Sequence, residues 1–186
     1  MRFTMQVPHG RRLAGGLALG AMLLGSTSAA VATTRPATTP TWVTTQGKVV
    51  HLTVIAGWNN VNAGFNFDGG AHGQLVVTVP LGDKVIGTFK NNVNTPHNVV
   101  IIPYTTPQPS HSVTPAFPGS RSPLPSFRSR PSGPPPRSNK PQTVTFVASK
   151  AGTYMIICGV PGHALAGMWD TFVVSRTAKV ASVSFK

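Results

Sequence analysis

Three residues that could bind a soft metal ion recur near the C-terminus at a regular spacing. Cys158, His163 and Met168 are five residues apart, with glycines and a proline between them, so one short loop can direct all three side chains to a point. His97 stands far upstream, at the start of an expected strand. A thiolate, two imidazoles and a distant thioether are the donors of copper sites that transfer electrons. The spacing therefore predicts one copper ion, cycling between Cu(I) and Cu(II), bound by these four residues.

Each of these residues also has an ordinary structural explanation. A single cysteine at a strand end is usually a small buried apolar residue, Met168 beside Trp169 could fill the core, and His163 could be a plain loop residue. The joint pattern is what favours a metal site over the separate explanations. Three further histidines belong to no such pattern, and we expect them to be structural or exposed: His51, His72 and His111.

The elements that must hold these residues are predicted to be strands. After residue 47 the chain consists of short runs rich in Val, Ile, Phe and Thr, separated by Gly, Asn and Pro, which is typical of strands and turns. Seven to nine short strands in one domain predict an all-β antiparallel sandwich or barrel. The expected strands are 49–55, 65–67, 75–79, 85–89, 99–102, 144–147, 154–157, 172–174 and 180–185.

The domain is expected to span residues 48–186, after a Thr/Pro-rich linker over residues 33–47. Residues 105–141 interrupt it with a segment rich in proline, serine and arginine. Prolines at this density block both helices and strand pairing, so we predict a low-complexity surface insertion, extended and partly disordered. It could be a basic arm for an acidic partner or a loop that is merely tolerated, and we favour the loop.

Residues 1–32 have the layout of a secretory signal. Three arginines precede an apolar run, and small residues suited to cleavage follow near Ala30 and Ala32. The strongly apolar part is about half of the ~20 residues that span a bilayer, which favours a cleaved signal, although an uncleaved membrane anchor stays possible. The prediction is a periplasmic or otherwise extracytoplasmic protein. Since an exported chain with one cysteine cannot form an internal disulfide, Cys158 needs another explanation, and a metal provides it.

The charge balance is unusual, with 16 Lys and Arg against 3 Asp and no Glu. Such a balance often indicates a nucleic-acid partner. No nucleic-acid-binding motif is visible, however, and many of the basic residues lie in or just after the Pro-rich insertion. A scarcity of carboxylates instead suits an acidic exterior, where carboxylate-dependent stability is lost. We therefore expect no nucleic-acid partner and an acidophilic source.

Several motifs resemble the sulfocyanin branch of the cupredoxin family: FNFDG (65–69), GQL (73–75), TPHN (95–98), CGVPGH (158–163) and GMW (167–169). The resemblance covers about residues 62–175, apart from the insertion. It implies a Greek-key β-sandwich with a type 1 copper ion near one end, held by His97, Cys158, His163 and Met168. It also implies that Asn98 braces the ligand loop through hydrogen bonds.

These features together predict a monomeric electron carrier that is not an enzyme. Its expected partners are redox proteins of a respiratory chain, such as cytochromes or a terminal oxidase, and it would meet a membrane only through them or through an N-terminal anchor. Copper enzymes with a second copper centre need further histidines, and Cys158 is followed by Gly159 instead. Copper storage or delivery is the alternative, although such proteins favour Met/His-rich or paired-Cys sites.

Overall fold

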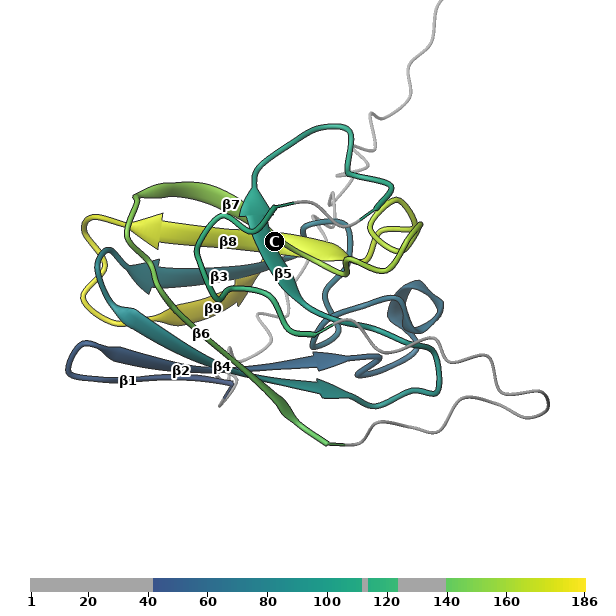
Figure 1. The fold of residues 1–186 in the computed structure, drawn as a ribbon, viewed down its shortest axis with the longest axis horizontal. Coiled ribbons are helices and arrows are strands. Elements are labelled where there is room, and N and C mark those ends of the chain that lie inside the picture. The colour runs from purple at the N-terminus through teal and green to yellow at the C-terminus, as the bar shows by residue number, and fades with distance from the viewer. Residues whose placement is uncertain (1–41, 112–113, 124–139) are drawn as a thin grey trace, which may run out of the picture. The chain divides into compact units, whose positions relative to one another are not determined.

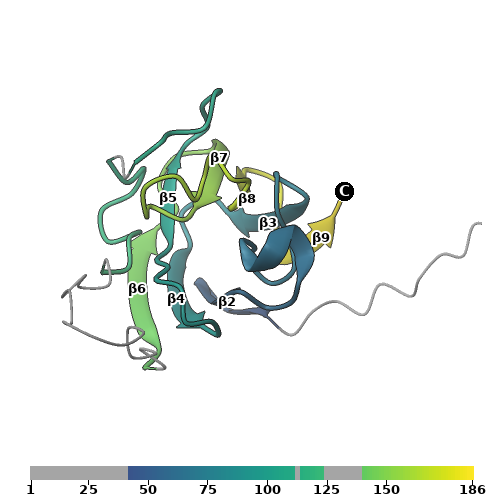
Figure 2. The same cartoon turned by 90° about the vertical axis from the view of Figure 1, so that its right-hand side faces the viewer.

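The computed structural model describes residues 42–111, 114–123 and 140–186, and the predicted signal segment lies outside them. These residues form an all-β domain whose strands make two layers (Figures 1 and 2). The strands are β1 (Val43–Gln46), β2 (Val49–Ala56), β3 (Leu75–Pro80), β4 (Lys84–Asn91), β5 (Val100–Pro103), β6 (Gln142–Val147), β7 (Gly152–Ile157), β8 (Trp169–Ser175) and β9 (Ser182–Phe185), with one 3-10 turn, η1 (Val61–Gly64). The predicted Greek-key β-sandwich is confirmed.

The two sheets have the strand orders β1-β2-β4-β6 and β5-β7-β8-β3-β9. Both are mixed, because β2 pairs with β4 and β3 pairs with β8 in parallel. This differs from the antiparallel sandwich that the sequence predicts. The reason lies in the connections: after β2 the chain crosses to the other sheet as β3 and then returns as β4, so β2 and β4 run in the same direction.

Most of the core lies between the sheets, where alternate residues of each strand point inward. In β2 these are Val50, Leu52 and Val54, which are at most 5% exposed. Strand β7 differs, because Tyr154 and every residue from there to Ile157 are buried. Its outward-facing Met155 and Ile157 belong to a second apolar cluster that includes Ala164. The strand that leads to Cys158 is therefore packed on both faces, which suits a site that must not move.

Two of the predicted boundaries are wrong. Strand β1 lies inside the predicted linker, and it was missed because the run VTTQ is short and polar. Residues 65–67 form no regular strand, and Phe67 makes only isolated bridges to Ala56 and Gly70. The other expected strands are confirmed within a few residues at each end.

The predicted surface insertion is partly core. Phe117 is 1% exposed and stacks on Phe146, with ring centroids 5.4 Å apart. The backbone around it bonds to β5, since the Ile101 N–H donates to the Ser120 carbonyl at 3.0 Å. The composition of the insertion predicts that it is exposed, but burial of the single aromatic ring of Phe117 packs part of this Pro-rich segment against the core. Residues 124–139 of the predicted insertion lie outside the described part of the chain.

All three acidic side chains of the chain are buried: Asp68, Asp83 and Asp170 are 3%, 1% and 0% exposed. The Ile55 N–H donates to Asp68 Oδ1 at 3.0 Å, and the Leu75 N–H donates to Asp170 Oδ1 at 2.9 Å. Burial disfavours the charged form and raises the pKa of both Asp68 and Asp170 to about 8. At mildly acidic pH each of these two carboxyl groups is therefore neutral and holds a neighbouring strand, β2 for Asp68 and β3 for Asp170.

Helices of the length and apolar character that a bilayer crossing requires are absent from residues 42–111, 114–123 and 140–186.

Candidate metal centre

Strand pairing brings the distant His97 to the C-terminal loop. Strands β5 and β7 are antiparallel neighbours, and Val100 lies opposite Ile157. His97 stands three residues before Val100, and Cys158 directly follows Ile157. In an antiparallel pair the residues that precede one strand and follow its neighbour meet at the same end. The pairing therefore places His97 and Cys158 side by side.

The loop between β7 and β8 is closed by its own backbone hydrogen bonds. The N–H of Cys158 donates to the Met168 carbonyl at 3.1 Å, and the N–H of Met168 donates to the His163 carbonyl at 2.9 Å. Gly162 and Gly167 have φ of +82° and +93°, a backbone conformation that costs glycine little. These turns explain why residues five apart in sequence can meet at one point.

Three donor atoms form a compact triangle. Cys158 Sγ lies 3.6 Å from His97 Nδ1 and 3.4 Å from His163 Nδ1, and the two Nδ1 atoms are 3.1 Å apart. A point equidistant from corners with these separations lies about 2 Å from each, close to the length of metal–imidazole and metal–thiolate bonds. No other group of three or more His, Cys, Asp or Glu donors with this closeness occurs among the described residues. The residues present therefore fit a single metal ion.

Met168 completes the predicted set from the same loop. It is fully buried, and its carbonyl accepts the hydrogen bond from Cys158 described above. Met168 and Cys158 also belong to the same core cluster. Its backbone is thus bonded to that of Cys158, within the loop that carries the other two donors.

Asn98 fastens the metal loop to the strand that carries His97. Its Oδ1 accepts a hydrogen bond from the Gly159 N–H at 2.8 Å and lies 3.9 Å from Cys158 Sγ. Its Nδ2 donates to the Ser122 carbonyl at 3.4 Å. Asn98 thus joins the metal loop to Ser122 of the predicted insertion, in the manner expected of a residue that orients metal ligands.

Phe65 is a site residue that the sequence analysis did not single out. Its ring meets both imidazoles edge to face, with centroids 6.0 Å from His97 and 4.9 Å from His163. It forms an apolar wall that fixes the ring planes. Its place in the FNFDG motif was the available signal, but the motif was assigned to a strand.

The electrostatics of the site follow from burial. Burial lowers the pKa of His97 to about 4, with a contribution from His163, and it lowers the pKa of His163 as well. It raises the pKa of the Cys158 thiol to about 11. The imidazoles are therefore neutral and able to ligate at neutral pH, whereas the thiol keeps its proton until a metal displaces it.

The other histidines stay apart from this cluster. His51 is exposed on β2, and His111 is exposed beside Ser110. His72 is exposed too, but it lies against the metal loop, because its backbone N–H donates to the Gly167 carbonyl at 2.9 Å. A side chain at Gly167 would meet the exposed His72 ring, which would have to move, and the φ of +93° also favours glycine there.

Comparison with known proteins identifies the family. A sulfocyanin (SoxE) domain model matches residues 36–117 and 139–183. Sulfocyanin from Sulfolobus acidocaldarius is 33% identical over 138 residues, which are 69% of this chain. The match spans 65% of that relative, so slightly less than two thirds of its length is covered.

The similar solved structures include auracyanin and rusticyanin, both described as copper proteins. Auracyanin A, a "blue" copper protein from Chloroflexus aurantiacus, is 24% identical with a TM-score of 0.47, and 68% of this chain and 99% of that chain are covered. Rusticyanin from Thiobacillus ferrooxidans is 20% identical with a TM-score of 0.45, and the covered shares are 72% and 86%.

The donor cluster and the family together support one type 1 copper ion as the cofactor. The match to the sulfocyanin domain covers well over half of the sequence, and the chain therefore belongs to the sulfocyanin family of cupredoxins.

Proposed function

We propose that this protein is a blue copper electron carrier that holds one copper ion through His97, Cys158, His163 and Met168. The observation that carries the proposal is the triangle of Cys158 Sγ and the two Nδ1 atoms, with sides of 3.1 to 3.6 Å. When bound, copper supplies one-electron chemistry by alternating between Cu(II) and Cu(I).

The protein's contribution is to keep the donors in place during that exchange. His97, Cys158 and Met168 are at most 2% exposed, and backbone hydrogen bonds and Asn98 restrain the loop. Donors held in this way change little in position between oxidation states, which favours rapid electron transfer. Copper storage or delivery is less well supported, because donors that must release a metal need to be accessible.

Electrons are proposed to enter and leave beside His163, which is only partly buried. Around it the loop exposes apolar and small residues, including Leu165 at 54%, and the Asn62 side chain donates to the Ala166 carbonyl at 2.7 Å. This hydrogen bond joins η1 to the loop. The resulting uncharged surface could come close to a redox partner without stripping water from charged groups.

The setting of this function is also a proposal. We infer an exported protein that passes electrons between respiratory partners, such as cytochromes or a terminal oxidase, in an acidic medium. The acidic setting is supported by the burial of all three aspartates, which leaves no acidic side chain on the surface of the described residues. Export is supported by the pattern of residues 1–32.

The experiment that tests the function is the visible spectrum of the copper-loaded protein. We expect an intense band from thiolate-to-copper charge transfer that disappears on reduction and returns on oxidation, with one copper per chain. A protein that binds copper but stays colourless when oxidised would contradict the proposal.

A second prediction tests Met168 as the weak axial ligand. Met168→Gln should keep copper bound and lower the reduction potential, because a harder oxygen donor favours Cu(II). A tenfold gain in preference for Cu(II) corresponds to about 59 mV in a one-electron couple, and we expect a shift of at least this size in a redox titration. An unchanged potential would mean that Met168 only packs in the core.

A further inference from the structure

The end of the sandwich opposite the metal centre is made of four turns. They are residues 47–48 between β1 and β2, 81–83 between β3 and β4, 148–151 between β6 and β7, and 176–181 between β8 and β9. Strand β7 runs from this end to Cys158 over six residues. At about 3.3 Å per residue, the turns lie roughly 20 Å from the metal ligands.

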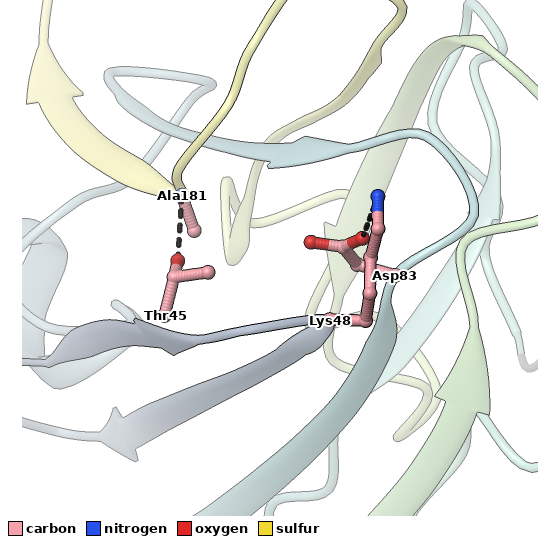
Figure 3. A network of polar contacts seen from close by, with 4 residues as sticks. All are labelled: Thr45, Lys48, Asp83 and Ala181. Atoms are coloured by element: carbon pink, nitrogen blue, oxygen red, sulfur yellow. Dashed lines mark hydrogen bonds and ion pairs between the residues drawn. The ribbon is translucent and has the colours of Figure 1, made fainter.

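Hydrogen bonds join these turns into one surface. The Lys84 N–H donates to the Lys48 carbonyl at 2.9 Å, and the Gly82 N–H donates to the Ala148 carbonyl at 2.9 Å. Between the sheets, the Ala181 N–H donates to Thr45 Oγ1 at 2.8 Å, as Figure 3 shows. The four turns therefore act together rather than as separate loops.

This surface carries five exposed basic side chains, and we name it the basic end: Lys48, Lys84, Lys150, Arg176 and Lys179. Its one acidic residue, Asp83, is 1% exposed and pairs with Lys48 at 3.5 Å (Figure 3). Asp68 and Asp170 bond to Ile55 and Leu75, near the metal end of their strands. Outward-facing carboxylate side chains are therefore absent from the basic end.

Two exposed apolar side chains accompany the basic residues. Val147 is 49% exposed and lies opposite Lys84 in the pairing of β4 with β6, and Val180 is 62% exposed next to Lys179. Small apolar groups among flexible cations suit the boundary between lipid headgroups and acyl chains.

We propose that the basic end is a docking surface for a membrane that contains anionic phospholipids. Protein interfaces are enriched in aromatic residues and Arg and depleted in Lys, but the basic end holds four lysines and one arginine, and the four turns contain no Trp, Tyr or Phe. Lysine attracts anionic headgroups without needing a fixed partner geometry. Docking through the basic end would leave the metal centre facing away from the lipid, free to meet its redox partners.

Lysine footprinting on vesicles tests this orientation directly. The full chain is acetylated with an amine-reactive reagent in buffer, with phosphatidylcholine vesicles, and with vesicles containing phosphatidylglycerol, and the modified lysines are identified by mass spectrometry. We expect protection of Lys48, Lys84, Lys150 and Lys179 only with phosphatidylglycerol. Lys90, Lys140 and Lys186, toward the other end of the strands, should react equally in all three conditions. Equal labelling of both sets, or protection of the second set alone, would overturn the proposal and leave an acidic protein as the partner to seek.

Matched charge variants supply an independent measurement in the full chain. The triple replacement of Lys84, Lys150 and Lys179 by Gln should reduce partitioning onto phosphatidylglycerol vesicles on the order of a hundredfold, from the contribution of each lysine near an anionic surface. It should also remove most of the salt dependence of binding. The control replaces Lys90, Lys140 and Lys186 by Gln, which gives the same net charge and the same N-terminal segment. Equal losses in the two variants would show that total charge, not the basic end, determines binding.

Discussion

Replacing Cys158 by serine is expected to abolish the blue colour of the copper-loaded protein and its reversible one-electron reduction. Serine has nearly the same shape, but its hydroxyl cannot provide the thiolate from which the charge-transfer band arises. The two Nδ1 atoms that lie 3.6 and 3.4 Å from the sulfur would remain. Copper held by the imidazoles alone would be a different site, with weak absorption and a different potential.

Two controls separate this effect from misfolding. The free energy of unfolding of metal-free Cys158→Ser should differ from that of the metal-free wild type by about 1 to 3 kcal/mol, which is the usual effect of one buried polar replacement. His51→Ala removes an exposed imidazole on β2 and should leave spectrum and potential unchanged. An intense blue band that survived in Cys158→Ser would rule out this cysteine as the ligand.

Asp68→Asn is expected to make the protein more stable at neutral pH and to change little in acid. The pKa of Asp68 is about 8 in the folded protein and 3.8 in an ordinary setting. The native state therefore binds this proton more tightly than the unfolded chain does, and the resulting stability is complete below about pH 4. It is lost as pH rises toward 8, at about 1.4 kcal/mol per pH unit between the two pKa values. Asparagine keeps the oxygen that accepts from Ile55 but never ionises, so it avoids the loss.

The measurement is denaturant unfolding of both metal-free proteins from pH 4 to pH 8. Taking the difference between them cancels the titration of groups that do not interact with Asp68; Asp170 is the exception, because the Asp68 charge contributes to its raised pKa. The free energies of unfolding should agree near pH 4 and separate by roughly 4 kcal/mol at pH 7 in favour of Asp68→Asn. A difference that stayed constant with pH would mean that Asp68 is ionised in the folded protein.

The sequence predicted the metal centre better than it predicted its surroundings. The proposed ligands Cys158, His163 and Met168 lie five residues apart in one loop, so their spacing alone carried the prediction. His97 was harder to find, because it joins the site only through the pairing of β5 with β7. The sequence did not identify Phe65 as a site residue. An aromatic residue in a short apolar run gives the same sequence pattern whether its ring packs inside a strand or against two imidazoles.

The fold class followed from composition, but the parallel strand pairs did not. Alternation of apolar residues identifies a strand without naming its neighbour, and parallel pairing here depends on crossings between the sheets. Phe117 shows a similar gap. Prolines on either side suggested a solvated loop, and nothing local revealed that β5 and Phe146 offered this ring a place in the core.

The burial of every aspartate also determines how the outside of the molecule responds to acid. A typical protein gains positive charge between about pH 5 and pH 2 as exposed carboxylates take up protons. Here no Asp or Glu side chain is exposed among the described residues, so the exterior charge changes little over that range. Electrophoretic mobility should therefore stay nearly flat through strongly acidic conditions, and docking partners would meet an unchanging electrostatic field while the medium fluctuates.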